Sequence, residues 1–239
     1  MIVIEKLTKI FGYYPVLRGI DLSIEKGQFL ALLGPNGSGK TTLLRILTGL
    51  SKPSGGQITI GGWNIPDEIA AVRQQLGIVS HLTLLYDTLT AEENLMFFAR
   101  LYNLPQETRA ERVAAMLERV GLGKRAKDVV NTFSRGMQQR LAIARALIHD
   151  PAILLLDEPY TGLDQDASAL LDQLLHDVAG VAEGQRTTIM TTHDLRRAHS
   201  LTSHVAILSR GKVGFYGETT AIPADDLPRI YADTLGAAS

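Results

Sequence analysis

One stretch, residues 34–42, constrains the fold of this chain more than any other. Its sequence, Gly-Pro-Asn-Gly-Ser-Gly-Lys-Thr-Thr, matches the pattern G-x-x-x-x-G-K-[ST]. The apolar run 29–33 precedes it, and the helix-compatible run 42–47 follows it. A strand, a glycine-rich loop and a helix in this order are typical of a phosphate-binding loop. The sequence therefore predicts a site for the phosphates of a nucleotide. The alternative is a glycine-rich turn with an incidental Lys-Thr pair.

Each residue type in the stretch suits this role. Glycines let backbone N–H groups turn towards an anion, and a helix N-terminus adds partial positive charge. Lys40 can reach the terminal phosphates and offset charge on the transferred group, so we expect it to be catalytic. The Thr41 hydroxyl can bind Mg²⁺. The predicted nucleotide-binding residues of the loop are Gly34, Pro35, Asn36, Gly37, Ser38, Gly39, Lys40, Thr41 and Thr42.

Composition excludes several other classes of protein. The 239 residues can bury one large α/β core or two small ones, and a net charge of −1 argues against non-specific nucleic-acid binding. The absence of cysteine excludes disulfides, Fe–S clusters and zinc-thiolate sites. The N-terminus lacks the continuous apolar centre of a cleavable signal, and no apolar run approaches the ~18–20 residues that cross a bilayer. If the protein works at a membrane, another subunit must span it.

The order of the expected elements predicts an α/β fold with a helical insertion. Strands are expected at 1–7, 17–24, 29–33, 57–60 (an edge strand), 75–81, 152–156 and 187–192, with a hairpin at 205–208 and 212–215. Helices are expected after the phosphate loop to about residue 49 and at 91–101, 105–120, 134–148 and 163–178. The tail from residue 219 is weakly patterned. We interpret residues 1–239 as a single domain, with a helical subdomain at about 82–150 inserted into the α/β core.

A second motif, Asp157-Glu158-Pro159, follows the apolar run 153–156. Ligands of parallel sheets bind outside the carboxyl ends of the strands, where the phosphate loop also ends. Asp157 is therefore expected to support Mg²⁺, directly or through water, and Glu158 to act on an attacking water. The alternative is that these residues only begin a surface turn.

A third motif lies between the other two, at residues 133–140, with the sequence Phe-Ser-Arg-Gly-Met-Gln-Gln-Arg. On its own it predicts a capped helix start, with Ser134 as the N-cap. In its position it resembles the LSGGQ signature of the ATP-binding-cassette (ABC) family. Ser134 and Gly136 match that signature, while Phe133, Arg135 and Met137 depart from it. A serine hydroxyl and a glycine at a helix N-terminus can form an anion site.

The resemblance covers nearly the whole chain and implies further site residues. Residues 161–164 resemble the D-loop, with Asp164 as its carboxylate, and His193 resembles the switch histidine that contacts the γ-phosphate. A lone histidine at a strand end is otherwise more often structural. Phe11 resembles the aromatic that stacks on adenine, with Tyr13 as the fallback and an ordinary turn aromatic as the alternative.

The family resemblance also implies a fold and an assembly. The fold is α/β, a P-loop NTPase core with a mixed sheet, an N-terminal antiparallel β subdomain and an inserted α-helical subdomain. Two copies, or this chain and a paralogous cassette, would associate head to tail. Each ATP with its Mg²⁺ would lie between Lys40 and Asp157 of one chain and Ser134 and Gly136 of the other.

One departure concerns His81, which stands where the family usually has a glutamine that senses Mg²⁺ and the membrane partner. It is an implied nucleotide-binding residue and metal ligand. Since the charge of histidine changes near neutrality, we expect ATPase coupling to be pH-sensitive over about pH 6 to 7.5. His81 and the leucine-rich segment after it resemble the ATP-binding subunits of haem exporters for cytochrome c maturation. They also resemble drug and polysaccharide exporter subunits.

The function implied by this resemblance is ATP hydrolysis that drives transport, with export favoured, through a separate transmembrane permease. The chain would then lie peripherally at the cytoplasmic face of the cell membrane and bind no nucleic acid. The alternatives are a soluble ABC protein that acts on ribosomes or DNA, and a nucleotide-gated scaffold without turnover. The presence of both Glu158 and His193 argues against the scaffold. The sequence does not name the cargo, and residues 81–102 are the expected surface towards the permease.

Overall fold

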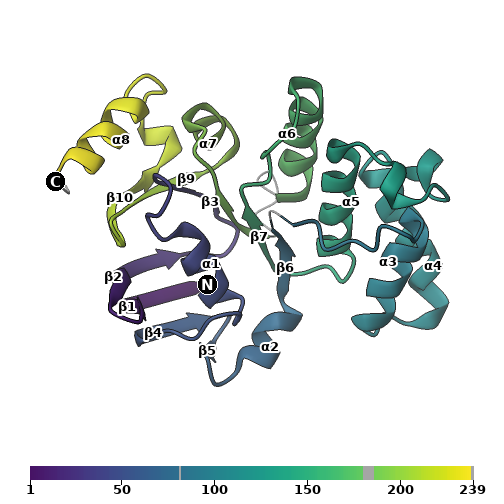
Figure 1. Ribbon diagram of the computed structural model, residues 1–239, viewed down its shortest axis with the longest axis horizontal. Helices are drawn as coiled ribbons and strands as arrows, with labels where there is room; N and C mark the ends of the chain where they lie inside the picture. The colour runs from purple at the N-terminus through teal and green to yellow at the C-terminus, as the bar shows by residue number, and fades with distance from the viewer. Residues whose placement is uncertain (81, 180–185, 238–239) are drawn as a thin grey trace.

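The computed structural model describes residues 1–80, 82–179 and 186–237, and its strands form two sheets (Figure 1). The first sheet has the order β2-β1-β4-β5 and the second β10-β9-β3-β8-β7-β6. The strands of the first sheet are β1 (Ile2–Phe11), β2 (Tyr14–Ile24), β4 (Gly55–Ile60) and β5 (Trp63–Ile65). Those of the second are β3 (Phe29–Leu33), β6 (Leu76–Val79), β7 (Ile153–Asp157), β8 (Thr187–Thr191), β9 (His204–Ser209) and β10 (Lys212–Glu218).

The second sheet places the predicted chemistry at one edge. Its strands β9, β3, β8, β7 and β6 are paired in parallel, and only β10 runs antiparallel. The carboxyl ends of β3, β7 and β8 therefore meet, and these are the ends that carry the phosphate loop, Asp157 and Thr191. The first sheet is antiparallel throughout. The expected mixed sheet and N-terminal antiparallel sheet are confirmed.

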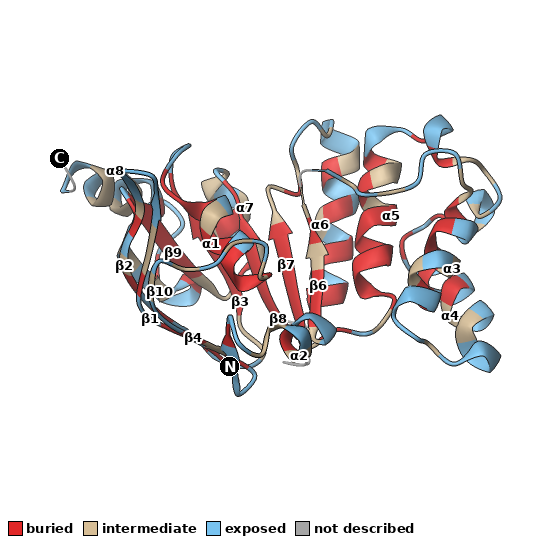
Figure 2. Cartoon of the chain, turned by 60° about the horizontal axis from the view of Figure 1, so that its bottom comes forward, coloured by how far each residue is buried: buried red, intermediate tan, exposed pale blue. Residues whose placement is uncertain are grey.

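Helices cover both faces of the second sheet. The helices of the described residues are α1 (Lys40–Leu47), α2 (Ile69–Gln74), α3 (Ala91–Leu101), α4 (Gln106–Arg119), α5 (Arg135–Leu147), α6 (Gln165–Ala179), α7 (Leu195–Leu201) and α8 (Leu227–Gly236). Of these, α3 and α4 pack against each other and against α5, and α2 packs against β5. Strand β7 shows how the layers arise: Ile153 and Leu155 pack towards α1 and the first sheet, while Leu154 and Leu156 pack towards α5 and α6. Because both faces are covered, all four side chains are buried, and β7 appears red in Figure 2.

The segment from α3 to α5 is helical, as expected from its sequence. Thr90 and Glu93 form a capping box at the start of α3, and the Ser134 hydroxyl accepts a hydrogen bond from the Met137 N–H at the start of α5. The N-cap role predicted for Ser134 is thus confirmed. The division of the chain into one domain with a helical subdomain at about 82–150 stays a prediction.

Several expectations about individual elements were wrong. β4 is not an edge strand, because β5 pairs with its outer side. β1 and β2 extend to Phe11 and Tyr14, so the connecting turn is shorter than expected. The helices α2, α7 and α8 were not expected. α2 and α7 are too short for a clear helical period, and α8 packs through Leu227 against the sheet.

Among the helices of the described residues, none has the length and apolar character that a bilayer crossing requires.

Candidate active site

The phosphate loop lies where two of its glycines have no room for a side chain. At Gly34 (φ 151°) a Cβ would contact the Leu208 carbonyl oxygen and lie 2.7 Å from Ser38 Oγ. At Gly39 (φ 112°) a Cβ would lie 2.6 Å from the Leu17 side chain. Both glycines also have positive φ, which other residues rarely adopt. The loop is therefore held between β9 and β2 in a conformation that requires glycine.

A cavity of about 300 Å³ opens over this loop. It is lined by Val16, Asn36, Gly37, Ser38, Gly39, Lys40, Thr41, Thr42 and Glu158. The Ser38 hydroxyl is buried and has no hydrogen-bond partner among the described residues. Because a buried hydroxyl without a partner is costly, this one fits a phosphate oxygen as its acceptor. The cavity joins most of the predicted loop to Glu158, and Val16 is a lining residue that the sequence did not indicate.

Lys40 is buried against the loop that precedes it. Its Nζ donates hydrogen bonds to the carbonyl oxygens of Gly34, at 2.6 Å, and Pro35, at 3.2 Å. Burial lowers the pKa of Lys40, and the charges of Glu158 and Asp157 partly oppose this effect. The ammonium group is thus held against the loop carbonyls and lies close enough to Glu158 and Asp157 for their charges to act on it.

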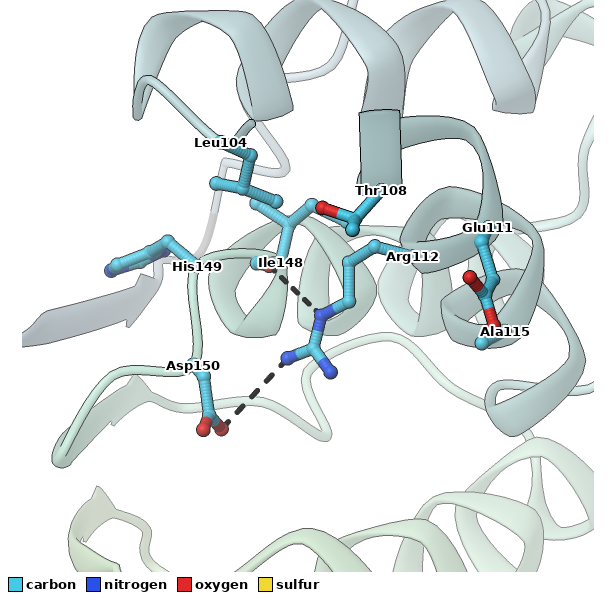
Figure 3. Close-up of a pocket in the computed structure, with 8 residues that line it drawn as sticks. All are labelled: Leu104, Thr108, Glu111, Arg112, Ala115, Ile148, His149 and Asp150. Atoms are coloured by element: carbon cyan, nitrogen blue, oxygen red, sulfur yellow. Dashed lines mark hydrogen bonds and ion pairs between the residues drawn. The ribbon is translucent and has the colours of Figure 1, made fainter. Parts of the chain in front are cut away.

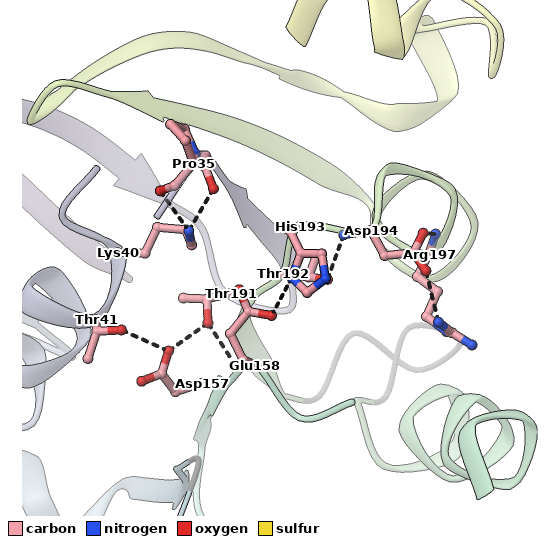
Figure 4. A network of polar contacts seen from close by, with 11 residues as sticks. Pro35, Lys40, Thr41, Asp157, Glu158, Thr191, Thr192, His193, Asp194 and Arg197 are labelled. Carbon is pink, nitrogen blue, oxygen red and sulfur yellow. Dashed lines mark hydrogen bonds and ion pairs between the residues drawn. The ribbon is translucent and has the colours of Figure 1, made fainter. Parts of the chain in front are cut away.

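A chain of hydroxyl and carboxylate groups crosses from α1 to β8 (Figure 4). The Thr41 hydroxyl donates to Asp157 Oδ1 at 3.3 Å, and the Thr191 hydroxyl donates to the same oxygen at 2.7 Å. The Thr191 oxygen also accepts a hydrogen bond from the Glu158 N–H at 2.9 Å. Thr191 therefore positions both carboxylate residues, a role that the sequence analysis missed. The available signal was a hydroxyl residue at the carboxyl end of the strand beside β7.

The donor set at Thr41 and Asp157 fits Mg²⁺. Mg²⁺ prefers oxygen ligands and often binds one or two carboxylates together with substrate phosphates. In residues 1–80, 82–179 and 186–237 no group of three or more His, Cys, Asp or Glu side chains could hold a metal on its own. A magnesium ion at this site would thus take its remaining ligands from phosphate and water, and it would offset phosphate charge.

Glu158 and His193 form a contact at the rim of the same site. His193 Nδ1 lies 3.0 Å from Glu158 Oε2, and Figure 4 shows the two side chains directed towards each other. Glu158 has φ 49°, a left-handed conformation that is uncommon outside glycine, and its N–H is fixed by Thr191. Glu158 is 23% exposed and His193 76%. The carboxylate is thus partly enclosed, while the imidazole is free to meet a bound group.

Four predicted site residues lie elsewhere. Phe11 ends β1, half exposed, with Lys9 Nζ 4.6 Å from its ring centroid. Ser134 and Gly136 lie at the start of α5, and Asp164 caps α6 by accepting a hydrogen bond from a backbone N–H. In the described part of the chain, none of the four lines the cavity. His81 falls outside the described residues.

Arg135 and Met137, which depart from the signature pattern, each contact another part of the chain. Arg135 lies over the backbone of Gly162, where an added Cβ would be 2.6 Å from the guanidinium carbon. Met137 packs against the core that α5 shares with the helical segment. The helix N-terminus itself stays open, because Ser134 and Arg135 are exposed.

A second cavity, of about 420 Å³, lies between α4 and the end of α5 (Figure 3). His149 on its wall stacks on Tyr102 with ring centroids 3.7 Å apart, and its Nε2 lies 3.1 Å from the Leu76 carbonyl oxygen. Burial lowers the pKa of His149 to about 4. No predicted site residue lines this cavity.

Comparison with known proteins places this geometry in a family. The family model described as "ABC transporter" matches residues 17–161. The linearmycin resistance ATP-binding protein LnrL of Bacillus subtilis is 38% identical over 98% of this chain and 73% of its own length. The Nod factor export ATP-binding protein I of Cupriavidus pinatubonensis is 39% identical over 87% of this chain and 63% of its own length.

Solved structures agree with these relatives. The dimeric ATP-binding cassette MJ0796, bound to ADP and Pi, superimposes with a TM-score of 0.80 at 31% identity and covers 92% of this chain and 99% of that one. The cbiO1 subunit of Clostridium perfringens, part of the transporter complex cbiONQ, superimposes with a TM-score of 0.84 at 29% identity over 97% of both chains. ATP-binding subunits of this kind use Mg²⁺, hydrolyse ATP and work as dimers with a membrane permease. The chain therefore belongs to the ABC transporter family, as one of its ATP-binding subunits.

Proposed function

We propose that this chain powers export by hydrolysing ATP in a head-to-tail dimer bound to a separate membrane permease. The observation that carries the proposal is the division of the predicted site into two parts. Lys40, Thr41 and Glu158 line one cavity, and Asp157 and His193 are joined to it by their contacts with Thr41 and Glu158. The signature residues at the start of α5 lie outside it. A second copy would supply the missing half, as the dimeric relative with ADP and Pi supports.

Each residue of the first half has a chemical role in the proposal. Lys40 offsets charge on the terminal phosphates, and Thr41 and Asp157 would hold Mg²⁺. Glu158 accepts a proton from the attacking water. His193 contacts both the γ-phosphate and Glu158 and so keeps the two in position relative to each other. Phe11 would stack on adenine, on the face that Lys9 leaves free. His81 stays in the proposal as a further nucleotide or Mg²⁺ contact.

The second half acts from the partner copy. There the exposed Ser134 hydroxyl at the N-terminus of α5 would meet the γ-phosphate together with the backbone of Gly136, and Asp164 would contribute from the D-loop. Residues 82–150 would carry Ser134 and Gly136 as a unit. ATP closes the dimer because its phosphates complete both halves, and hydrolysis reopens the dimer because it removes the bridging charge.

The surface that faces the permease is proposed to lie on α3 and the loop before it. Exposed apolar side chains gather there: Leu82, Leu84, Tyr86, Phe97, Leu101 and Tyr102. Met96 and Phe98 of the same helix pack against the core instead. A cassette docked through this surface would lie peripherally at the cytoplasmic face of the membrane.

The relatives favour a drug or Nod-factor type of cargo, since one is named for linearmycin resistance and another for Nod factor export. Haem export for cytochrome c maturation is the second candidate, and it rests on the resemblance around His81 alone. Transport assays in inverted vesicles that contain this chain and its permease separate the two. Uptake of linearmycin or of a Nod factor without haem supports the first, and uptake of haem alone overturns it.

The hydrolytic proposal is tested by Glu158→Gln. The variant should bind ATP, lose at least about 100-fold in kcat, and accumulate as a dimer, because water is no longer activated while both halves still hold ATP. Phosphate release and light scattering measure these effects. A variant that keeps wild-type turnover, or that stays monomeric with saturating ATP and Mg²⁺, would contradict the proposal.

A further inference from the structure

Arg197 on α7 makes contacts with three other parts of the chain. Its Nη1 donates to Asp194 Oδ2 at 2.8 Å, and its Nε donates to Asp172 Oδ1 on α6 at 3.3 Å. Its guanidinium carbon also lies 4.5 Å from the ring centroid of Tyr160. The three polar side chains of this cluster are each about one third exposed or less, and Tyr160 is partly buried against the core. A planar guanidinium can satisfy two carboxylates and stack on an aromatic ring at once, which an ammonium group cannot do.

The contacts of Arg197 join the two segments that carry the proposed catalytic pair. Tyr160 comes two residues after Glu158, in the segment that leaves β7, and Asp194 directly follows His193, in the segment that leaves β8. Near the strands these segments are already connected, because the Glu158 N–H donates to Thr191. Arg197 connects the same two segments a second time, farther from the strands than the contact between Glu158 and His193.

Local hydrogen bonds also fix the backbone on either side of His193. Asp194 is the N-cap of α7: its carboxylate accepts the Arg197 N–H at 3.1 Å, and its own N–H donates to Thr192 Oγ1 at 3.1 Å. Both neighbours of His193 are therefore fixed. His193 itself is largely exposed, and in the described residues its side chain has a polar contact with Glu158 alone. Its direction thus depends on the backbone that Asp194 and Arg197 hold.

We propose that Arg197 is a positioning residue for ATP hydrolysis. By holding the segment after β7 and the segment after β8 together, it keeps His193 in contact with Glu158. It touches neither nucleotide nor water in this role. In the described residues, the hydrogen bonds of Lys40 and Thr41 and the close neighbours of the loop glycines do not include the cluster, so we expect the phosphate loop to be unchanged when Arg197 is removed. The inference rests on the proposed roles of Glu158 and His193.

The structure supplies a matched control and a conservative variant. Arg196, the preceding residue of the same helix, is exposed, and within the described residues its side chain makes no hydrogen bond or ion pair. Arg196→Gln therefore removes the same charge from the same helix without touching the cluster. Arg197→Lys keeps a cation near Asp194 but cannot bridge to Asp172 and stack on Tyr160 together.

The experiment measures steady-state ATPase kinetics of the full chain for the wild type, Arg197→Gln, Arg197→Lys and Arg196→Gln. A misplaced catalytic pair lowers the rate without weakening nucleotide binding, so Arg197→Gln should lose about tenfold in kcat with KM changed less than twofold. Arg197→Lys should recover part of this loss, and Arg196→Gln should match the wild type. The inference is overturned if kcat is unchanged, if KM rises as much as kcat falls, or if Arg196→Gln has the same effect.

Two further variants keep the outcome interpretable. If Arg197→Gln does not fold, Tyr160→Leu removes the aromatic contact and keeps both carboxylates, and it should lower kcat about threefold with KM unchanged. Unchanged kinetics would then overturn the inference. Glu158→Gln and His193→Ala are measured in the same series. If these two retain wild-type turnover, the proposed function fails. If they lose turnover while Arg197→Gln does not, only the role of Arg197 fails.

Discussion

The phosphate loop between β3 and α1 is enclosed by its own chain, whereas the N-terminus of α5 is open to solvent. Around the loop, Gly34 and Gly39 have no space for a Cβ, Lys40 is buried, and Ser38 holds an unpaired hydroxyl towards the cavity. At α5, Ser134 is exposed and its oxygen caps its own helix. Both are helix N-termini of comparable electrostatics, but only the phosphate loop lines a cavity. At α5, Gly136 is buried against Ala167, while Ser134 and Arg135 are exposed.

This difference indicates how the two regions are used. A phosphate group can be recognised at the loop by one chain, because the surrounding β2, β7 and β9 already fix its donors. The N-terminus of α5 offers hydrogen-bond donors that stay exposed to solvent. A second copy with its bound phosphate is therefore needed to remove water from this terminus. Substitutions in the loop should therefore affect binding by a single chain, and substitutions at α5 should affect only what two chains do together.

The largest effect that separates the two regions is expected for Lys40→Ala. Loss of the buried ammonium removes a charge-assisted contact of about 1.5–3 kcal/mol, so ATP should bind the single chain about 10–100-fold more weakly. Fluorescent-nucleotide titration at concentrations that keep the chain monomeric measures this, with the exposed Lys26→Ala as a control. An affinity like that of the wild type would remove the distinction between an enclosed half and an open half.

A smaller and different effect is expected for Ser134→Ala. Binding of ATP by one chain should be unchanged, while dimer formation and kcat should fall about tenfold, since one contact to the partner's phosphate is lost. The variant also loses a helix cap worth about 1 kcal/mol of stability. Thr90→Ala, which removes the equivalent cap of α3, separates the two effects. If Thr90→Ala impairs dimerisation as strongly, Ser134 acts only as a cap.

The smallest effect concerns His149, which belongs to neither half. Its pKa is lowered from 6.5 to about 4, chiefly by burial, so the unfolded chain binds a proton between these pH values and the folded chain does not. Stability should therefore be complete above about pH 6.5 and fall as the pH drops towards 4. After allowance for partial exposure the loss is about 1 kcal/mol.

Chemical denaturation of the wild type and of His149→Gln across this pH range tests the point. The variant should have a flatter stability profile and wild-type ATP affinity at pH 7.5, while His176→Gln, on the exposed face of α6, should keep the wild-type profile. A profile unchanged by His149→Gln would show that other groups cause the acid sensitivity.

Much of the α/β framework could be predicted because its signals are local. The apolar runs before the phosphate loop and before Asp157 mark strands buried on both faces, and Ser134 marks a helix start. The exposed or short elements escaped prediction. The pairing of β4 with β5 depends on a strand of three residues, and α7 begins at a cap whose carboxylate also binds Arg197.

The candidate site shows the same division. Glu158, Thr41 and Lys40 belong to patterns with a fixed spacing, so they could be named from sequence. Thr191 and Arg197 act through partners more than 20 residues away, at Asp157, Asp172 and Tyr160. Such contacts depend on the order of strands in the sheet, which no local pattern of the chain contains.

Cross-linking between the two regions tests the head-to-tail dimer most directly. The chain has no cysteine, so Asn36→Cys on the phosphate loop and Arg135→Cys at the start of α5 introduce the only thiols. Both positions are exposed. In a Glu158→Gln chain that carries both changes, ATP and Mg²⁺ should produce a covalent dimer with a short bis-maleimide. Either change alone should give no covalent dimer, so the chains should run as monomers on a denaturing gel. A cross-link that does not depend on ATP, or that forms equally well with Asn36→Cys alone, would contradict the assignment of the two halves to different copies.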